Sequence, residues 1–125
     1  MLIVDDEKYI LLALNKYFTK LGFEVDCAQD LVIAKSKLNE DSFNIVICDL
    51  CLQGAHNLTG FELIKFINEK NRDIAIIVLS AFGSAEIELE ARRLGAAAFV
   101  HKPTPLSDLA QVIFEALASA QLVKE

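Results

Sequence analysis

The chain has 125 residues, the size of one ordinary domain, and we expect residues 1–125 to form a single unit. Its formal net charge of −6 argues against nucleic-acid binding, because that affinity rests largely on neutralising phosphates with Lys and Arg. No apolar run approaches the roughly 18 residues of a membrane span, and the N-terminal segment lacks the basic region of a signal peptide, so we expect a cytoplasmic protein without membrane association.

The hydrophobic pattern alternates short β-type runs with stretches at helical spacing. Asp30 and Ser84 are suited to cap the helices that they begin, Gly22 and Gly95 to end the first and fourth helices, and Pro105 to begin the last one. In chain order we expect a strand at 2–4, a helix at 7–21, a strand at 23–28, a helix at 30–38, a strand at 43–48, a helix at 60–71, a strand at 74–79, a helix at 84–94, a strand at 97–100 and a helix at 105–122.

This alternation predicts an α/β fold with a five-stranded parallel, doubly wound sheet and five helices. Hydrophobic residues make up 54% of the chain, which suits strands that are buried on both faces. In such a sheet, ligands bind in a crevice beyond the carboxyl ends of the strands. The residues at those ends are therefore the candidates for function.

Polar residues follow four of the five predicted strands. Asp5 and Asp6 follow the first strand, Asp49 the third, Ser80 the fourth and Lys102 the fifth. Taken singly, each has an ordinary structural explanation, such as acidic residues that stabilise the beginning of a helix. Their joint placement at one predicted edge favours a functional site instead.

These residue types suit phosphoryl chemistry. Neighbouring carboxylates raise one another's pKa unless a cation joins them, and Mg²⁺ prefers such oxygen ligands with room for water. A carboxylate can also attack phosphorus to form an aspartyl phosphate. Lys102 would supply a fixed positive charge and Ser80 a hydroxyl donor, and phosphoryl transfer mainly needs positioning and charge neutralisation.

Four stretches of the chain resemble the receiver (CheY-like) family of response regulators in two-component signalling. They are LIVDDE at 2–7, IVICDL at 45–50, IVLSA at 77–81 and GAAAFVHKP at 95–103. Each occupies its own strand end, and together they span nearly the whole chain. The resemblance implies a flavodoxin-like fold with strand order 2-1-3-4-5.

The resemblance also implies a role for each acidic residue. Asp49 would be the phospho-acceptor, and Lys102 would pair with the phosphoryl group. Mg²⁺ would be held by Asp49, by Asp6 directly and by Asp5 mainly through water. The backbone carbonyl of Cys51 would be a further metal ligand.

A switch is implied as well. Ser80 would hydrogen-bond to the phosphoryl group and move toward it, while Phe99 would change rotamer and turn inward. The Lys102–Pro103 peptide bond is expected to be cis, which is plausible because X-Pro bonds have a small trans preference.

The function implied by the resemblance is a phosphorylation-controlled signalling switch. A sensor histidine kinase or a phosphotransfer protein would donate the phosphoryl group, and the domain would catalyse only transfer to, and hydrolysis from, its own Asp49. A phosphorylation-dependent homodimer and an output domain beyond this chain both stay open. The loop at 50–59 departs from the family pattern in length and in Gln53, which leaves the phosphoryl lifetime open.

Other functions were weighed against this one. The chain could be a receiver-like scaffold that is never phosphorylated, but the intact acidic set argues against that. A phosphatase or transferase would need a larger substrate pocket, and a flavin phosphate would be repelled by the acidic first strand end. Cys48 and Cys51 have the spacing of a redox pair but follow a strand rather than begin a helix, and no metal-ligand spacing links His56 to His101.

Overall fold

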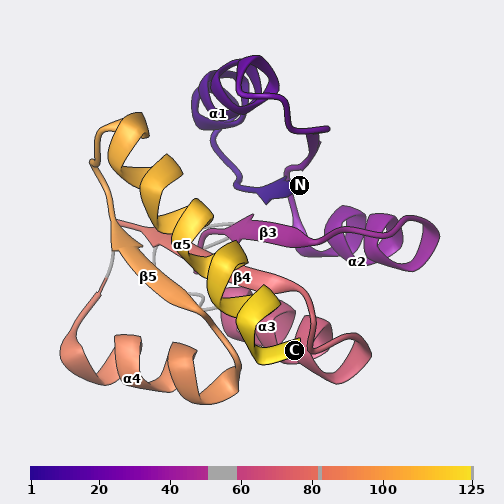
Figure 1. The fold of residues 1–125 in the computed structure, drawn as a ribbon, viewed down its shortest axis with the longest axis vertical. Helices are drawn as coiled ribbons and strands as arrows, with labels where there is room; N and C mark the ends of the chain where they lie inside the picture. The colour runs from indigo at the N-terminus through magenta and orange to yellow at the C-terminus, as the bar shows by residue number, and fades with distance from the viewer. Residues whose placement is uncertain (51–58, 82, 125) are drawn as a thin grey trace.

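The computed structural model describes residues 1–50, 59–81 and 83–124, with side chains described up to residue 119. One parallel sheet has the order β2-β1-β3-β4-β5 (Figure 1). Its strands are β1 (Leu2–Val4), β2 (Asp26–Ala28), β3 (Ile45–Cys48), β4 (Ala75–Ser80) and β5 (Ala98–His101). The helices are α1 (Lys8–Lys20), α2 (Leu31–Glu40), α3 (Thr59–Lys70), α4 (Ala85–Leu94) and α5 (Leu106–Lys124). The predicted fold class and strand order are confirmed.

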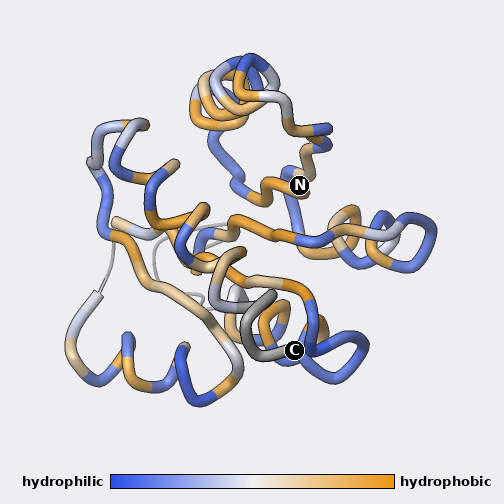
Figure 2. Tube along the Cα trace, in the orientation of Figure 1, coloured by the Kyte–Doolittle hydropathy of each residue, from blue (hydrophilic) through white to orange (hydrophobic). Residues whose placement is uncertain are grey.

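The sheet is covered on both faces, which explains why its strands are continuous apolar runs. Helices α1 and α5 pack on one face and α2, α3 and α4 on the other, and each face has its own cluster of buried side chains (Figure 1). Every residue of β1, β3 and β4 is buried. Figure 2 shows the strands as hydrophobic stretches, while hydrophilic residues concentrate on the helices and loops.

The capping residues act as the sequence predicts. The Asp30 carboxylate accepts a hydrogen bond from the Ile33 N–H at 2.8 Å, and the Ser84 hydroxyl accepts one from the Ile87 N–H at 3.2 Å. Each satisfies a backbone donor that the first turn of a helix leaves without a partner. At the end of α4, Gly95 has a φ of 125°, a conformation that favours glycine.

Strand β2 is shorter than predicted, since the pattern indicated a strand at 23–28 and only Asp26–Ala28 pairs with β1. In the described part of the chain, the pairing of β2 with β1 begins where Asp26 lies opposite Leu2. Phe23 instead closes the end of α1, where its N–H donates to the Phe18 carbonyl at 3.1 Å and its ring packs edge-on against that of Phe18. Its hydrophobic side chain packs against the buried cluster on the α1 and α5 side of the sheet, without strand pairing.

The register of the strands brings their carboxyl ends to one edge. Val4 is opposite Cys48, Cys48 is opposite Val78, and Ser80 is opposite His101. The residues that follow β1, β3, β4 and β5 therefore gather at a common edge of the sheet. Among the helices described, none combines the length and apolar character needed to cross a membrane.

Candidate functional site

Two buried carboxylates lie side by side at this edge. The N–H of Asp5 donates to the Ala28 carbonyl at 3.1 Å, and the N–H of Asp49 donates to the Val4 carbonyl at 3.0 Å. These bonds extend the sheet pairing one residue beyond β1 and β3, and so fix the backbone at both aspartates. Asp5 is 2% exposed and Asp49 is 6% exposed.

Lys102 joins the two carboxylates. Its ammonium donates to Asp5 Oδ2 at 2.8 Å and to Asp49 Oδ2 at 3.0 Å. Its own N–H donates to the Ser80 carbonyl at 2.9 Å, which anchors its backbone beside the end of β4. The other oxygen of Asp5 accepts a hydrogen bond from the Glu7 N–H at 2.9 Å, so this carboxylate is held on both sides.

Burial and nearby charges both shift the pKa values of Asp5 and Lys102. Burial raises the pKa of Asp5, and the nearby Asp49 charge adds to that, although hydrogen bonds from Lys102 and Glu7 oppose it. Burial alone disfavours the Lys102 ammonium, but its hydrogen bonds and its attraction to Asp5 and Asp49 outweigh this, and the pKa of Lys102 is raised. Lys102 therefore stays protonated and positively charged at neutral pH.

Asp5, Asp6 and Asp49 together could hold a cation. Each offers a carboxylate oxygen, and these oxygens lie within 4.8 Å of one another. Asp6 is exposed, which leaves one side open to water, while the other two are buried. Lys102 contacts Asp5 and Asp49, and with Asp6 the cluster carries more negative than positive charge. Such an excess of hard oxygen ligands with access to water fits Mg²⁺. The predicted ligand at Cys51 lies outside the described residues.

The predicted switch residues lie beside this cluster. Ser80, the last residue of β4, is completely buried, and Phe99 in β5 is 9% exposed. Phe99 belongs to the cluster that α2, α3 and α4 cover, where Ala91 and Ala96 are also buried. The Lys102–Pro103 peptide bond is cis.

Gly60 supports the site, a role that sequence reasoning did not assign to this first residue of a predicted helix. A Cβ atom built on Gly60 would lie 2.6 Å from the Asp49 carbonyl oxygen and 2.5 Å from Leu50 Cα. The Gly60 N–H donates to the Leu50 carbonyl at 2.9 Å. The signal in the sequence was a glycine within a helical pattern, where it is normally unfavourable unless another backbone approaches closely.

The described cysteines do not support a redox function. Cys48 lies within β3 rather than at the beginning of a helix, and burial together with the charges of Asp49 and Asp5 raises its pKa to about 12. A reactive thiol needs the opposite shift. Cys51 and His56 lie outside the described residues.

The comparisons with known proteins agree with this geometry. Residues 1–114 match the family model of the response regulator receiver domain. The transcriptional regulatory protein ZraR of Klebsiella oxytoca is 29% identical over 98% of this chain, which spans only 27% of that protein. Sporulation initiation phosphotransferase F of Bacillus subtilis (strain 168) is 26% identical, over 90% of this chain and 89% of its own length.

A solved structure of similar size shows the same fold. The CheY-like response regulator receiver domain protein of Methanospirillum hungatei JF-1 superposes with a TM-score of 0.88 and is 27% identical, over 96% of this chain and 94% of its own. Receiver domains are signalling switches rather than enzymes in the ordinary sense. The match over residues 1–114 places this chain in the response regulator receiver family.

Proposed function

We propose that this chain is a phosphorylation-controlled switch that accepts a phosphoryl group on Asp49, with Mg²⁺ as its cofactor. The observation that carries the proposal is the buried Asp49 carboxylate, which Lys102 contacts at 3.0 Å and which shares a cluster of carboxylate oxygens with Asp5 and Asp6. A structural ion pair would need one carboxylate for one ammonium. Lys102 contacts two carboxylates and the nearby Asp6 adds a third, so the cluster has a negative excess that suits a cation.

The proposed reaction is a displacement at phosphorus. An oxygen of Asp49 attacks the phosphorus of a phosphohistidine, an O–P bond forms, the N–P bond breaks, and the departing imidazole nitrogen keeps the bonding electron pair. The product is an acyl phosphate on Asp49. Hydrolysis by water then breaks the O–P bond and returns the carboxylate and inorganic phosphate.

The surrounding residues supply charge neutralisation. Lys102 already lies within hydrogen-bond distance of Asp49, so its ammonium is in place to pair with phosphoryl oxygens. Asp5, Asp6 and Asp49 would hold Mg²⁺, which when bound offsets the negative charge of the phosphoryl oxygens. Asp5 and Asp6 are not nucleophiles in this proposal, and their role is to bind the cation.

The output of the switch would come from Ser80 and Phe99. A phosphoryl group on Asp49 offers the Ser80 hydroxyl a charged acceptor, which draws the end of β4 toward it. Phe99 lies in the neighbouring strand β5, and its packing changes as the end of β4 moves. Such a local change biases a surface between two states, to which partners respond.

We propose a sensor histidine kinase or a phosphotransfer protein as the donor, and the cytoplasm as the place of action. Receiver domains interact with such donors, and some form dimers. For this chain, a phosphorylation-dependent homodimer and an attached output domain are both compatible with the proposal. The relatives that are longer than this chain are the reason to consider an output domain.

The decisive experiment measures the intact mass of the protein after incubation with acetyl phosphate, with and without Mg²⁺. We expect a gain of one phosphoryl group that requires Mg²⁺ and is lost in Asp49→Asn. Asp73→Asn is the matched control, because Asp73 is exposed and precedes β4 at the opposite edge of the sheet. Folded wild-type protein that gains no mass under any condition would contradict the proposal and favour a scaffold that is never phosphorylated.

A further inference from the structure

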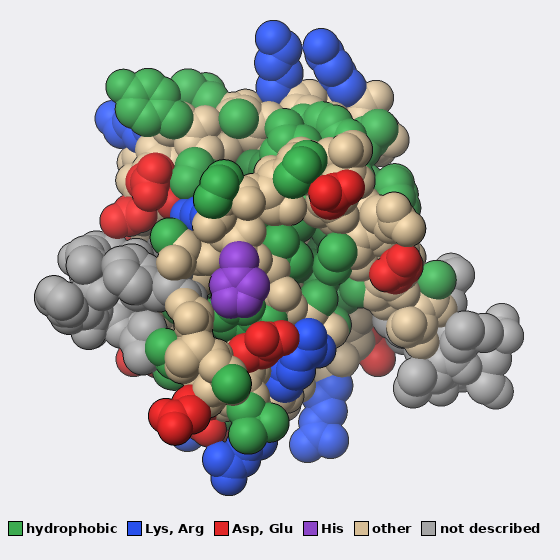
Figure 3. All heavy atoms as spheres, turned by 90° about the vertical axis from the view of Figure 1, so that its left-hand side faces the viewer, with side chains coloured by type: hydrophobic (Ala, Val, Ile, Leu, Met, Phe, Trp, Pro, Cys, Tyr) green, Lys and Arg blue, Asp and Glu red, His purple; other side chains and the backbone are tan. Residues whose placement is uncertain are grey.

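His101 covers the side of Phe99 that faces away from the core. The two residues are separated by one position in β5, so their side chains lie on the same face of the sheet. Their ring centroids are 5.1 Å apart, with 53° between the ring planes. His101 is exposed whereas Phe99 is 9% exposed, so the imidazole is the outer layer over a buried ring. On the side of the molecule that Figure 3 draws, a histidine side chain lies at the surface.

The backbone at Gly83 closes against both rings. A Cβ atom built on Gly83 would lie 2.6 Å from His101 Cε1 and 3.1 Å from Phe99 Cε1. Gly83 does not have the positive φ of Gly22 and Gly95, so an alanine at this position would meet a steric obstacle rather than backbone strain. What position 83 requires is the absence of a side chain.

We infer that His101 is a positioning residue for the switch, which together with Gly83 keeps Phe99 in its buried arrangement. This inference rests on the proposed function. Phe99 cannot leave its site unless the imidazole swings away or the segment at Gly83 moves. Gly83 follows Ser80 by three residues, so the same segment that responds to the phosphoryl group also bears on His101.

The position of β5 in the sheet explains why a side chain is needed here. β5 is the last strand in the order, so within the described part of the chain no neighbouring strand flanks Phe99 on that side. Ser80 is in register with His101, which places the cover directly beside the residue that would bind the phosphoryl group. A buried Phe99 is the arrangement expected when Ser80 has moved toward Asp49. His101 therefore favours the conformation that is ready for the phosphoryl group.

The test measures the affinity of the full chain for beryllofluoride, a phosphoryl mimic, in the presence of Mg²⁺. We expect His101→Ala to weaken binding by about three- to tenfold, because a smaller share of molecules holds Phe99 in place. His101→Phe, which keeps a planar ring, should restore most of the affinity. Gln111→Ala, at an exposed position of α5, is the control and should leave the affinity unchanged.

A double-mutant cycle tests the contact with Gly83. Gly83→Ala alone should weaken binding, since its methyl group displaces the imidazole. In the background of His101→Ala the same change should have a smaller effect, because the closest obstacle, the imidazole, is gone and only the looser contact with Phe99 remains. Fully additive effects, or an unchanged affinity of His101→Ala, would overturn the inference.

A second readout does not depend on phosphoryl chemistry. In the free protein, NMR should show nuclear Overhauser effects between the Phe99 ring and the Gly83 α-protons, and His101→Ala should weaken them. Unchanged effects in this variant would count against the inference. If wild-type protein fails to bind beryllofluoride, the proposed function is contradicted, while these spectra still decide whether His101 positions Phe99.

Discussion

Lys102 donates a hydrogen bond to Asp49 across 3.0 Å, although 53 residues separate the two in sequence. They meet because β3 and β5 end at the same edge of a parallel sheet, with β4 between them. Both side chains are largely buried, so solvent weakens their attraction less than it would at the surface. Lys102 also contacts Asp5, which is why several predictions depend on this cluster.

Replacing Lys102 with methionine should destabilise the protein by roughly 2–4 kcal/mol, because two buried carboxylates lose their shared ammonium. Phosphorylation by acetyl phosphate should also slow by at least tenfold. Urea unfolding and intact-mass time courses measure the two effects. Lys16→Met on the exposed side of α1 serves as the control, and equal losses in both variants would show that the Lys102 contacts contribute nothing specific.

Replacing Asp5 with asparagine should stabilise the protein at neutral pH when Mg²⁺ is removed by a chelator, because the amide carries no charge for burial to disfavour. Burial raises the pKa of Asp5 above its usual value of 3.8, so the folded state favours the protonated form. This contribution to stability is present below pH 3.8 and is lost as the pH rises through the folded pKa. The neutral amide avoids that loss.

The same variant tests the cation site. Mg²⁺ should raise the melting temperature of wild-type protein, since a ligand that binds only the folded state stabilises it. In Asp5→Asn this increase should be strongly reduced. Asp30→Asn is the control, because asparagine caps a helix about as well as aspartate does. A variant at Asp5 that responds to Mg²⁺ like wild type would remove Asp5 from the site.

Replacing Gly60 with alanine should cost about 1–3 kcal/mol of stability and slow phosphorylation, because the added methyl group collides with the backbone of Asp49 and Leu50. Gly22→Ala is an informative comparison. Gly22 has a φ of 101° and no atom near the added Cβ, so alanine there strains the backbone far from the acidic cluster. It should lower the melting temperature but leave the phosphorylation rate of the folded protein intact.

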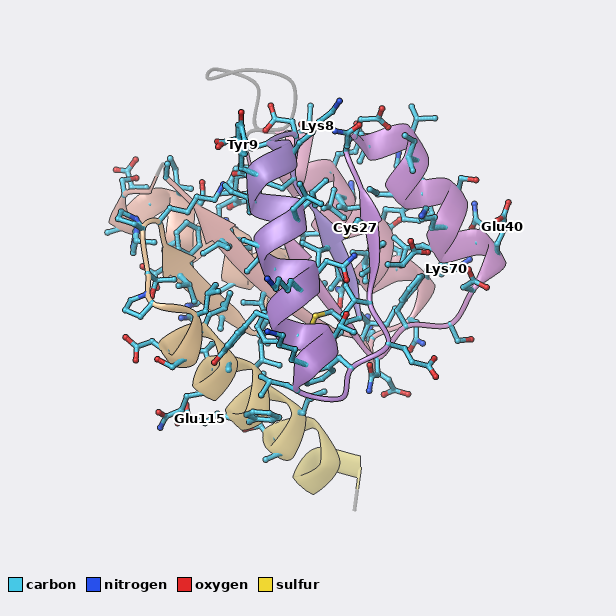
Figure 4. The ribbon with its side chains drawn as sticks, turned by 90° about the horizontal axis from the view of Figure 1, so that it is seen from above. Lys8, Tyr9, Cys27, Glu40, Lys70 and Glu115 are labelled. Atoms are coloured by element: carbon cyan, nitrogen blue, oxygen red, sulfur yellow. The ribbon has the colours of Figure 1, made fainter. Side chains whose placement is uncertain are left out.

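The cysteines should differ in reactivity. Cys48 is fully buried with a pKa of about 12, so we expect no alkylation at mildly alkaline pH until the protein unfolds. Cys27 lies beneath α1, where its sulfur accepts a hydrogen bond from Asn15 at 3.7 Å (Figure 4). Because Cys27 is only half-buried, it should react in the folded state, although more slowly than a fully exposed thiol. Peptide mapping after iodoacetamide treatment distinguishes the two, and rapid modification of Cys48 would contradict its burial.

The sequence by itself determined the fold class and the candidate residues. Alternating apolar runs and helical spacing are local patterns, and in a parallel sheet the carboxyl ends of the strands must share an edge. Asp5, Asp49, Ser80 and Lys102 could therefore be grouped before any contact was known. The helix caps at Asp30 and Ser84 were equally local, because a cap bonds within its own first turn.

Only the tertiary structure decided the contacts between elements. The start of β2 at Asp26, rather than at Phe23, depends on its pairing with β1. The crowding at Gly60 depends on how α3 approaches the residues after β3. The layering of His101 over Phe99 depends on where the backbone of Gly83 lies. Each of these is set by packing between segments distant in the chain. Sequence periodicity records which side of an element is apolar, but it does not record which atoms will lie opposite.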